Sequence, residues 1–319
     1  MAISSMPERL AVRFCLTAIL FAGLISQTSA VEIQGHRGAR GLLPENTLPA
    51  FEKALDLGVD VLELDIVVSE DGIPIIHHDR ALSPDRTRLN GVWIDREIPL
   101  NKLTAAELAA YDVGRIRAGS RYAKRFPDQV PVDGTRVPAL SDLFALVAAR
   151  GNKTVRFNIE TKRSPLEPGD TPEPEAFARL LIETARNAGV ADRITLQSFD
   201  WSTLIAARRI DPAIPTACLT AEARWLDSAE AGKDGTSPWL GGLDVDAFGG
   251  SIQKTARAAG CAIWSPFHRN VTKEAVQAAH AEGLKVIVWT VNEVKDMTRL
   301  VGHGVDGLIT DYPDRAAGF

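Results

Sequence analysis

Cysteine is scarce in this chain of 319 residues, and three other features are missing from it. It has only three cysteines, so it is not a disulfide scaffold. After the first 30 residues no apolar run approaches the roughly 18 residues of a membrane span. Internal repeats and low-complexity segments are also absent. The formal net charge is −5, so a basic surplus is missing too, and we expect neither a nucleic-acid partner nor stable insertion into a membrane.

The N-terminus predicts a secretory signal peptide over residues 1–30. Arg9 and Arg13 form a basic start, residues 14–25 are apolar, and residues 26–30 end with small side chains at the −3 and −1 positions. We therefore expect export, to a bacterial periplasm, with 31–319 as the mature domain. An uncleaved anchor is the alternative. Cys15 lacks the small residues that precede a lipid-attachment cysteine.

Only two cysteines remain after this segment is removed. An exported protein can join Cys218 to Cys261, but we favour two separate buried thiols. Removal also makes the chain slightly more acidic, because residues 1–30 contain two arginines and one glutamate.

After residue 30, short apolar strands alternate with amphipathic helical patterns. Helical stripes recur at 48–55, 140–147, 177–184 and 294–301, and Pro44-Glu45-Asn46-Thr47 supplies capping residues before the first. Eight such strands over this length predict an α/β fold, the (β/α)₈ TIM barrel. A doubly wound open sheet is the alternative, but no Gly-x-Gly-x-x-Gly turn follows the first strand. The predicted strands are 31–35, 59–68, 155–160, 193–198, 214–219, 262–265, 285–291 and 307–311.

One connection breaks the alternation. Residues 73–78 are strand-like, and only Glu70-Asp71-Gly72 separates them from the second strand. Because a parallel crossover needs a dozen or more residues, the second strand is predicted to fold back as a hairpin. A two-residue Asp71-Gly72 turn would place His78 opposite Asp65, with a slip of one or two residues possible. Pro74 requires this strand to lie at an edge.

A long insertion, at about 80–139, follows this hairpin. It contains one clear short helix, 103–111, and many turn residues. Because it follows His78, we expect it on the catalytic face, where it could act as a lid. The insertion has a basic run, which either attracts anionic substrates or, as we favour, is a solvated helix face. It consists of Arg115, Arg117, Arg121, Lys124 and Arg125. Residues 221–250 form a second irregular stretch.

Polar side chains follow most of the predicted barrel strands, at the ends where functional residues gather in such barrels. Glu63 and Asp65 are two residues apart and therefore face the same way, as do Glu160 and Lys162. Three inward carboxylates without a cysteine cluster suit one hard cation, Ca²⁺ or Mg²⁺. The alternative is a purely structural role, in which these charged residues form a salt-bridge network that closes the top of the barrel.

Two histidines and two basic side chains accompany the carboxylates. Arg37 and Lys162, beside a divalent ion, would neutralise the oxygens of a phosphodiester. His36 and His78 would then serve as general base and general acid.

Taken in order, eight motifs make the sequence resemble the glycerophosphodiester phosphodiesterase family over residues 32–315. They are His-Arg-Gly, Pro-Glu-Asn-Thr, Glu-Leu-Asp, Asp-Gly…His-Asp, Ile-Glu-Thr-Lys, Gln-Ser-Phe, Trp-Thr-Val-Asn and Gly-Leu-Ile-Thr-Asp-Tyr-Pro. The resemblance implies a TIM barrel, of secreted bacterial type, that hydrolyses glycerophosphodiesters to sn-glycerol 3-phosphate and an alcohol. Thr161 stands where the family has isoleucine, at an outward position.

The resemblance also implies a role for individual residues. His36 and His78 would be catalytic, and Phe199 and Trp289 would form walls for the glycerol. For His77, a packing or supporting role is favoured over catalysis. The metal ligands would be Glu63, Asp65 and Glu160, and the phosphate contacts Arg37 and Lys162.

Two other functions compete with this hypothesis. A related phospholipase-type barrel would act on intact lipids, but no clear apolar rim is present. A periplasmic protein that binds an organophosphate without cleaving it would not need two histidines beside three carboxylates. The sequence does not determine the oligomeric state.

Overall fold

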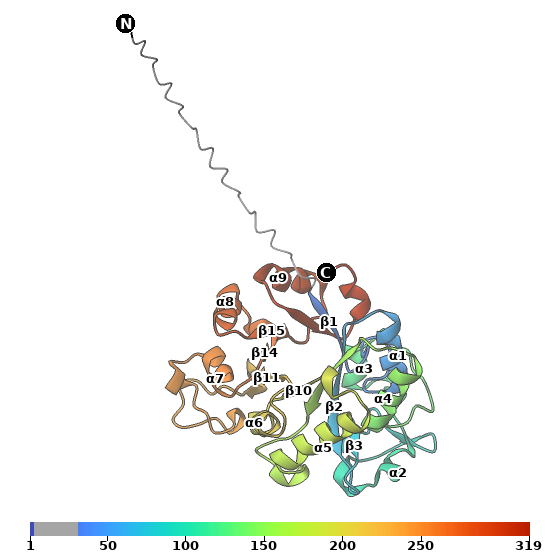
Figure 1. Cartoon of the computed structure of the whole chain (residues 1–319). Helices are drawn as coiled ribbons and strands as arrows, with labels where there is room; N and C mark the ends of the chain where they lie inside the picture. Colours follow the sequence, from blue (N-terminus) through green and yellow to red (C-terminus); the bar gives the residue numbers. More distant parts are fainter. Residues whose placement is uncertain (3–30) are drawn as a thin grey trace. The chain divides into compact units, whose positions relative to one another are not determined.

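Eight parallel strands close into a barrel in the computed structural model, which describes residues 1–2 and 31–319 (Figure 1). Each strand pairs with the next in chain order, and the last pairs with the first. The predicted (β/α)₈ barrel is therefore confirmed, while the predicted signal peptide lies outside the described residues, apart from residues 1–2. The barrel strands are β1 (Glu32–His36), β2 (Val61–Val68), β9 (Arg156–Thr161), β10 (Ile194–Ser198), β11 (Thr216–Thr220), β14 (Ile263–Pro266), β15 (Lys285–Val288) and β16 (Gly307–Thr310).

The helices surround the barrel and bury one apolar stripe each (Figure 1). The four predicted stripes all fall on helices. The first begins after Thr47, whose hydroxyl accepts from the amide of Ala50. None of the helices among the described residues is both long and apolar enough to cross a membrane. These helices are α1 (Leu48–Asp56), α4 (Leu140–Ala149), α5 (Pro174–Asn187), α6 (Trp201–Ile210), α7 (Ile252–Ala258), α8 (Lys273–Ala281) and α9 (Val294–His303).

A layer of buried amides crosses part of the barrel interior. Asn158 donates to the side-chain oxygens of Gln34, at 2.8 Å, and Gln197, at 3.0 Å. Gln197 in turn donates to Glu63 at 2.6 Å. Because buried polar groups need partners, this network fixes the direction of the acidic side chain above it.

The predicted hairpin is present, but its register was wrong by one residue. β3 (Pro74–Ile76) pairs antiparallel with β2 at the sheet edge, and His77, not His78, lies opposite Asp65. The turn has three residues because the Ser69 hydroxyl accepts from the amide of Ile73 and donates to Asp71. The edge position expected from Pro74 is confirmed.

Residues 80–139 form a small region of short strands and two helices beside β2 and β3. Its apolar residues pack in a cluster of their own with Val67 and Ile75 of the hairpin. The predicted helix 103–111 is shorter, because it begins after the capping residue Thr104 and ends before Tyr111, which pairs as a strand. The elements are β4 (Ala81–Leu82), β5 (Arg88–Leu89), β6 (Val92–Trp93), β7 (Ile98–Pro99), α2 (Ala105–Leu108), β8 (Tyr111–Asp112) and α3 (Arg121–Arg125).

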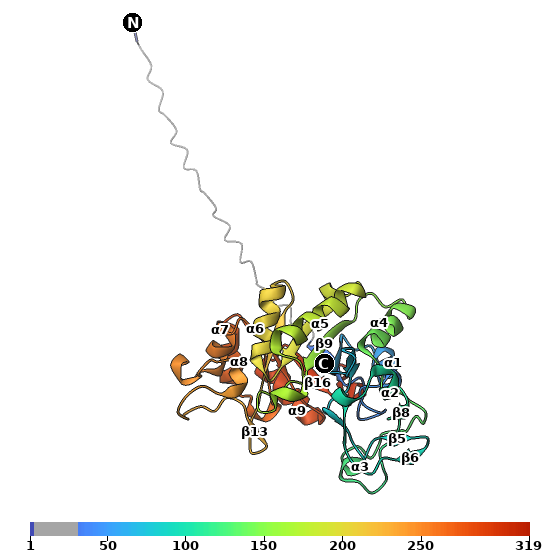
Figure 2. The ribbon, with the colours of Figure 1, turned by 90° about the horizontal axis from the view of Figure 1, so that it is seen from below.

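Residues 221–250 contain a two-stranded hairpin, β12 (Glu222–Ala223) and β13 (Leu226–Asp227), with Trp225 in its turn. Figure 2 shows β13 and the insertion extending to the same side of the barrel. A disulfide joins Cys218 of β11 to Cys261, whose Cα atoms lie 6.0 Å apart. The expectation of two separate thiols was therefore wrong: parallel pairing of β11 with β14 brings the two cysteines together.

Candidate active site

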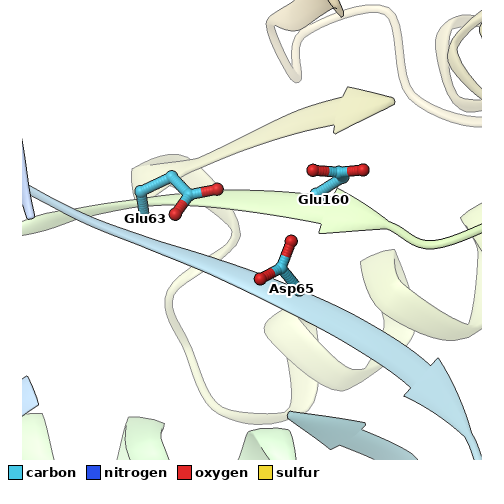
Figure 3. A group of neighbouring side chains, drawn as sticks. All are labelled: Glu63, Asp65 and Glu160. Carbon is cyan, nitrogen blue, oxygen red and sulfur yellow. The ribbon is translucent and has the colours of Figure 1, made fainter. Parts of the chain in front are cut away.

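Three carboxylates converge on two neighbouring strands, at the end of the barrel where β1 and β9 finish. Glu63 and Asp65 lie on β2, Glu160 lies on β9, and the strand register places Asp65 beside Glu160. One oxygen from each lies within 4.8 Å of the others, and Figure 3 shows the three side chains turned toward a common space. All three are at most 7% exposed.

The protein satisfies only part of the hydrogen-bonding capacity of this cluster. The amide of Arg37 donates to Glu63 at 3.0 Å, and Asn46 donates to Oδ2 of Asp65 at 2.9 Å. Oδ1 of Asp65 is buried without a hydrogen-bond partner among the described residues. A buried carboxylate oxygen left in this way is available as a ligand.

Simultaneous ionisation of all three carboxylates is unfavourable. Burial and the neighbouring carboxylates raise the pKa of Glu63 well above its usual range. Burial raises the pKa of Glu160 to about 7 despite Lys162. Burial also opposes ionisation of Asp65, but Arg37 and Lys162 hold its pKa well below the usual value. A divalent cation would remove the remaining repulsion, so the donor set fits a hard metal ion.

Two basic side chains border the cluster. Nζ of Lys162 lies 2.8 Å from Glu160 and 3.6 Å from Asp65. Nε of Arg37 lies 3.2 Å from Asp65, and its Nη1 donates to Glu45 at 3.0 Å. Both groups are therefore oriented beside the carboxylates, where an anionic group bound to the cation would also lie.

His36 is the last residue of β1 and is oriented by Asp311, which directly follows β16. Its Nδ1 donates to Asp311 at 2.6 Å, which leaves Nε2 facing the cluster, 3.9 Å from Glu63. Arg40 donates twice to Asp311, at 2.7 and 3.0 Å, and Asn292 donates to it at 2.7 Å. Burial, with the charge of Arg40, lowers the pKa of His36 to about 4.

His78 follows β3 and is held by the first residues of the insertion. Its Nδ1 donates to Asp79 at 2.6 Å, and Arg86 donates to both Asp79 and Glu45. Burial and the charge of Arg37 lower the pKa of His78 to about 3.

His77 points elsewhere. Its Nδ1 donates to the backbone carbonyl of Asp79 at 2.7 Å, and its side chain lines a small pocket that includes His78 but neither His36 nor the three carboxylates. His36 and His78, by contrast, both line one cavity of about 680 Å³ together with Glu63 and Glu160.

Aromatic side chains form the opposite wall of this region. Phe199 and Trp289, the two rings expected from the sequence, meet edge to face with centroids 5.4 Å apart. Trp225, Trp239 and Phe267 extend the same group. A second cavity, of about 770 Å³, also borders His78 and Glu160 and is lined by Phe199, Trp225 and Trp239.

Several site residues were not predicted from the sequence. Glu45 and Asn46 stand in the Pro-Glu-Asn-Thr motif, which was interpreted as a helix cap and a family motif but not as a source of site contacts, so their signal was available. Arg40 and Arg86 carry no spacing signal, since Arg40 pairs with Asp311 from the far end of the chain and the contacts of Arg86 depend on how the insertion packs. The basic run of the insertion is divided: Arg125 lines the 680 Å³ cavity, while Arg115 pairs with Asp133.

Comparison with known proteins gives a consistent result. A model of the glycerophosphoryl diester phosphodiesterase family matches residues 36–315. A glycerophosphodiester phosphodiesterase of Caldanaerobacter subterraneus is 28% identical over 280 residues, or 88% of this chain and 93% of that protein.

Solved structures agree with this match. One from Silicibacter pomeroyi, which bears the name of a glycerophosphoryl diester phosphodiesterase, is 35% identical, with a TM-score of 0.80 over 90% of this chain and 92% of that chain. An Oleispira antarctica phosphodiesterase, solved with its product sn-glycerol-3-phosphate, is 22% identical, with a TM-score of 0.64 over 89% and 94% of the two chains. The latter supports the fold alone.

Proposed function

The chain belongs to the glycerophosphoryl diester phosphodiesterase family and is a phosphoric diester hydrolase, and we propose that it cleaves glycerophosphodiesters with one divalent cation and two histidines. The products would be sn-glycerol 3-phosphate and an alcohol. One observation carries the proposal: two histidines, each oriented by its own carboxylate, border a single cavity with a buried cluster of acids.

Glu63, Asp65 and Glu160 would hold the cation, Ca²⁺ or Mg²⁺. When bound, it would neutralise charge on the non-bridging phosphate oxygens. Arg37 and Lys162 would contact the same phosphate from beside the cluster and orient it for attack. Trp289, in the wall of the 680 Å³ cavity, and Phe199, which contacts Trp289 from the wall of the 770 Å³ cavity, would pack against the carbon atoms of the glycerol.

The two histidines would divide the proton transfers. Nε2 of His36 would remove the proton of the nucleophile, which is either water or the 2-hydroxyl of the glycerol. His78 would act as the acid in its imidazolium form, in which Nδ1 still donates to Asp79 and Nε2 gives its proton to the oxygen of the leaving alcohol, which is otherwise a poor leaving group. The assignment of base and acid rests on the resemblance to the family.

The test is release of choline from glycerophosphocholine by the mature protein, with and without EDTA. We expect release that EDTA abolishes and that Ca²⁺ or Mg²⁺ restores. Release that persists in EDTA would contradict the metal-dependent mechanism. Tight binding without release would favour a binding protein, and cleavage of intact phospholipid but not of glycerophosphocholine would favour a phospholipase.

Export is part of this proposal. The N-terminal pattern supports it, and so does the Cys218–Cys261 disulfide, because such bonds persist mainly in oxidising compartments. Mass spectrometry of protein isolated from the periplasm should find Val31 or a near neighbour at the N-terminus. Exported material that retains Met1 would contradict cleavage.

A further inference from the structure

Five aromatic side chains from separate loops form one connected group beside the active site, which we call the aromatic group. Ring centroids lie 5.4 Å apart for Phe199 and Trp289, 6.4 Å for Phe199 and Trp239, and 6.1 Å for Trp225 and Trp289. Phe267 packs on both Trp225, at 5.7 Å, and Trp289, at 5.5 Å. Most of these contacts are edge to face, so each of them covers at most one face of one ring.

Trp225 is the most exposed member. It lies in the turn of the β12–β13 hairpin, and 61% of it is accessible to solvent. Because Trp225 borders both cavities and packs on Phe267 and Trp289, a ligand in either cavity would cover part of its exposed indole.

The protein places none of its own cations on these rings. Across residues 31–319, arginines stack on rings in eight places, among them Arg88 and Arg117 over Trp93, and none of the eight involves the aromatic group. This is so although Arg224 and Arg269 are close in sequence to Trp225 and Phe267. The described residues therefore supply no cation of their own to these rings.

The two cavities differ in the charge of their walls: basic groups predominate in the first and carboxylates in the second. The 680 Å³ cavity, which contains both histidines, has more arginines than carboxylates on its wall and suits the phosphate. The wall of the 770 Å³ cavity combines Phe199, Trp225 and Trp239 with five carboxylates against three basic groups. All three basic groups are already paired with carboxylates, Arg80 with Glu167 and Asp170, Lys162 with Glu160, and Arg163 with Asp200, so the wall has a surplus of two carboxylates. A positive group would be favoured in this second cavity.

We propose that the 770 Å³ cavity binds the leaving alcohol of the substrate, and that this alcohol carries a quaternary ammonium group, as choline does. The inference rests on the proposed function and adds a substrate class to it. Both cavities border His78 and Glu160, so a phosphodiester in the first cavity extends its alcohol into the second. A methylated ammonium has no N–H to satisfy and gains from aromatic faces, which is what Trp225 and Trp239 offer.

The decisive comparison needs no mutation. Glycerophosphocholine is compared with the ester of 3,3-dimethylbutanol, which has the shape of choline with carbon in place of the charged nitrogen. We expect kcat/KM to favour the choline ester by about 3- to 30-fold, mostly through KM. Glycerophosphoethanolamine should fall between them.

Substitutions then locate the subsite. Trp225→Leu and Trp239→Leu should bring the ratio of the two kcat/KM values toward one, while Trp225→Phe should keep most of it. Trp93→Leu is the matched control, because Trp93 lies in the insertion under two arginines, and the ratio should not change.

Failure of the subsite and failure of the proposed function give different results. A wild-type ratio of one or below, with both esters hydrolysed, would overturn the quaternary-ammonium subsite and leave the phosphodiesterase intact. Hydrolysis of neither ester would overturn the proposed function and the subsite with it. A ratio that survives both leucine substitutions would also overturn the subsite.

Discussion

His36 and His78 are each oriented by a carboxylate, but the carboxylate comes from the barrel for His36 and from the insertion for His78. In both, a carboxylate accepts from Nδ1 at 2.6 Å and leaves Nε2 free. Asp311, the partner of His36, follows a barrel strand and is 1% exposed. The side chain of Asp79, the partner of His78, is 41% exposed and begins the insertion.

The supports behind these carboxylates differ as well. Arg40 and Asn292, which hold Asp311, belong to loops at the barrel rim. Arg86, which holds Asp79, belongs to the insertion and stacks on Tyr122 of the same region. The barrel thus fixes one histidine, and the insertion fixes the other. The predictions below break or sharpen this contrast, from the largest expected effect to the smallest.

The largest effect is expected at Asp65, which has the buried carboxylate oxygen of the acidic cluster that lacks a hydrogen-bond partner within residues 31–319. Asp65→Asn should abolish hydrolysis, because it removes a charged ligand from the proposed metal site. The fold depends far less on this side chain, so the melting temperature should fall only modestly. Isothermal titration with Ca²⁺ and Mg²⁺ should show weakened binding. Asp56→Asn, at an exposed ion pair with Arg150, is the control. Tight metal binding that survives in Asp65→Asn would contradict the ligand assignment.

The two carboxylate partners should differ in importance. Asp311→Asn should lower kcat by about 10²- to 10⁴-fold, because a buried amide would favour the wrong imidazole tautomer and would remove the charged group to which Arg40 donates twice. Asp79→Asn should cost about 10- to 100-fold, since its group is more exposed. Steady-state kinetics on one substrate measure both. Equal losses would mean that the barrel and the insertion orient their histidines equally firmly.

Arg86 should connect the insertion to catalysis. Arg86→Gln should lower kcat by about 3- to 10-fold, because it releases both Asp79 and Glu45. Arg88→Gln is a matched control: Arg88 pairs with Asp112 and Asp133 inside the insertion, away from the histidines. Because general loosening of the insertion would affect both variants, kcat losses of the same size would argue against a positioning role for Arg86.

A pH effect on stability is expected at Glu45. Although burial opposes its ionisation, Arg37 and Arg86 lower the pKa of Glu45 to about 2, from an ordinary 4.5. Its contribution to stability is therefore full above pH 4.5 and is lost as the pH falls toward 2. Glu45→Gln should lower the unfolding free energy by about 2–3 kcal/mol at pH 7.

Urea denaturation at pH 7 and at pH 3 measures this effect. The gap between wild type and Glu45→Gln should be narrower at pH 3. Glu175→Gln, at an exposed pair with Arg179, should show no comparable gap. A gap that is the same at both pH values would show that the ion pairs of Glu45 do not carry the effect.

Much of this arrangement could be predicted from the sequence because the barrel imposes it. Alternation on β2 requires Glu63 and Asp65 to share a face, and parallel pairing brings Glu160 to the same end. The strands were predicted within two residues, except that β15 ends at Val288 rather than 291, and beyond it Trp289 forms only an isolated bridge with Phe267.

The predictions that failed concern side-chain contacts, which hydrophobic periodicity in the sequence does not reveal. The hairpin register was decided by the hydroxyl of Ser69, which stabilises a three-residue turn. The support of His78 by Arg86 depends on how the insertion folds back. The disulfide depended on two cysteines that lie 43 residues apart in sequence. Such long-range contacts have no signature in local spacing.

The central claim is that His36 and His78 carry different proton transfers, and one crossed measurement tests it most directly. His36→Ala and His78→Ala are each assayed on glycerophosphocholine and on the p-nitrophenyl ester of glycerophosphate, whose leaving group scarcely needs an acid. On the choline ester, each variant should lose about 10²- to 10⁴-fold in rate. On the p-nitrophenyl ester, His78→Ala should recover much of its rate and His36→Ala should not. Equal responses of the two variants would contradict the division of labour.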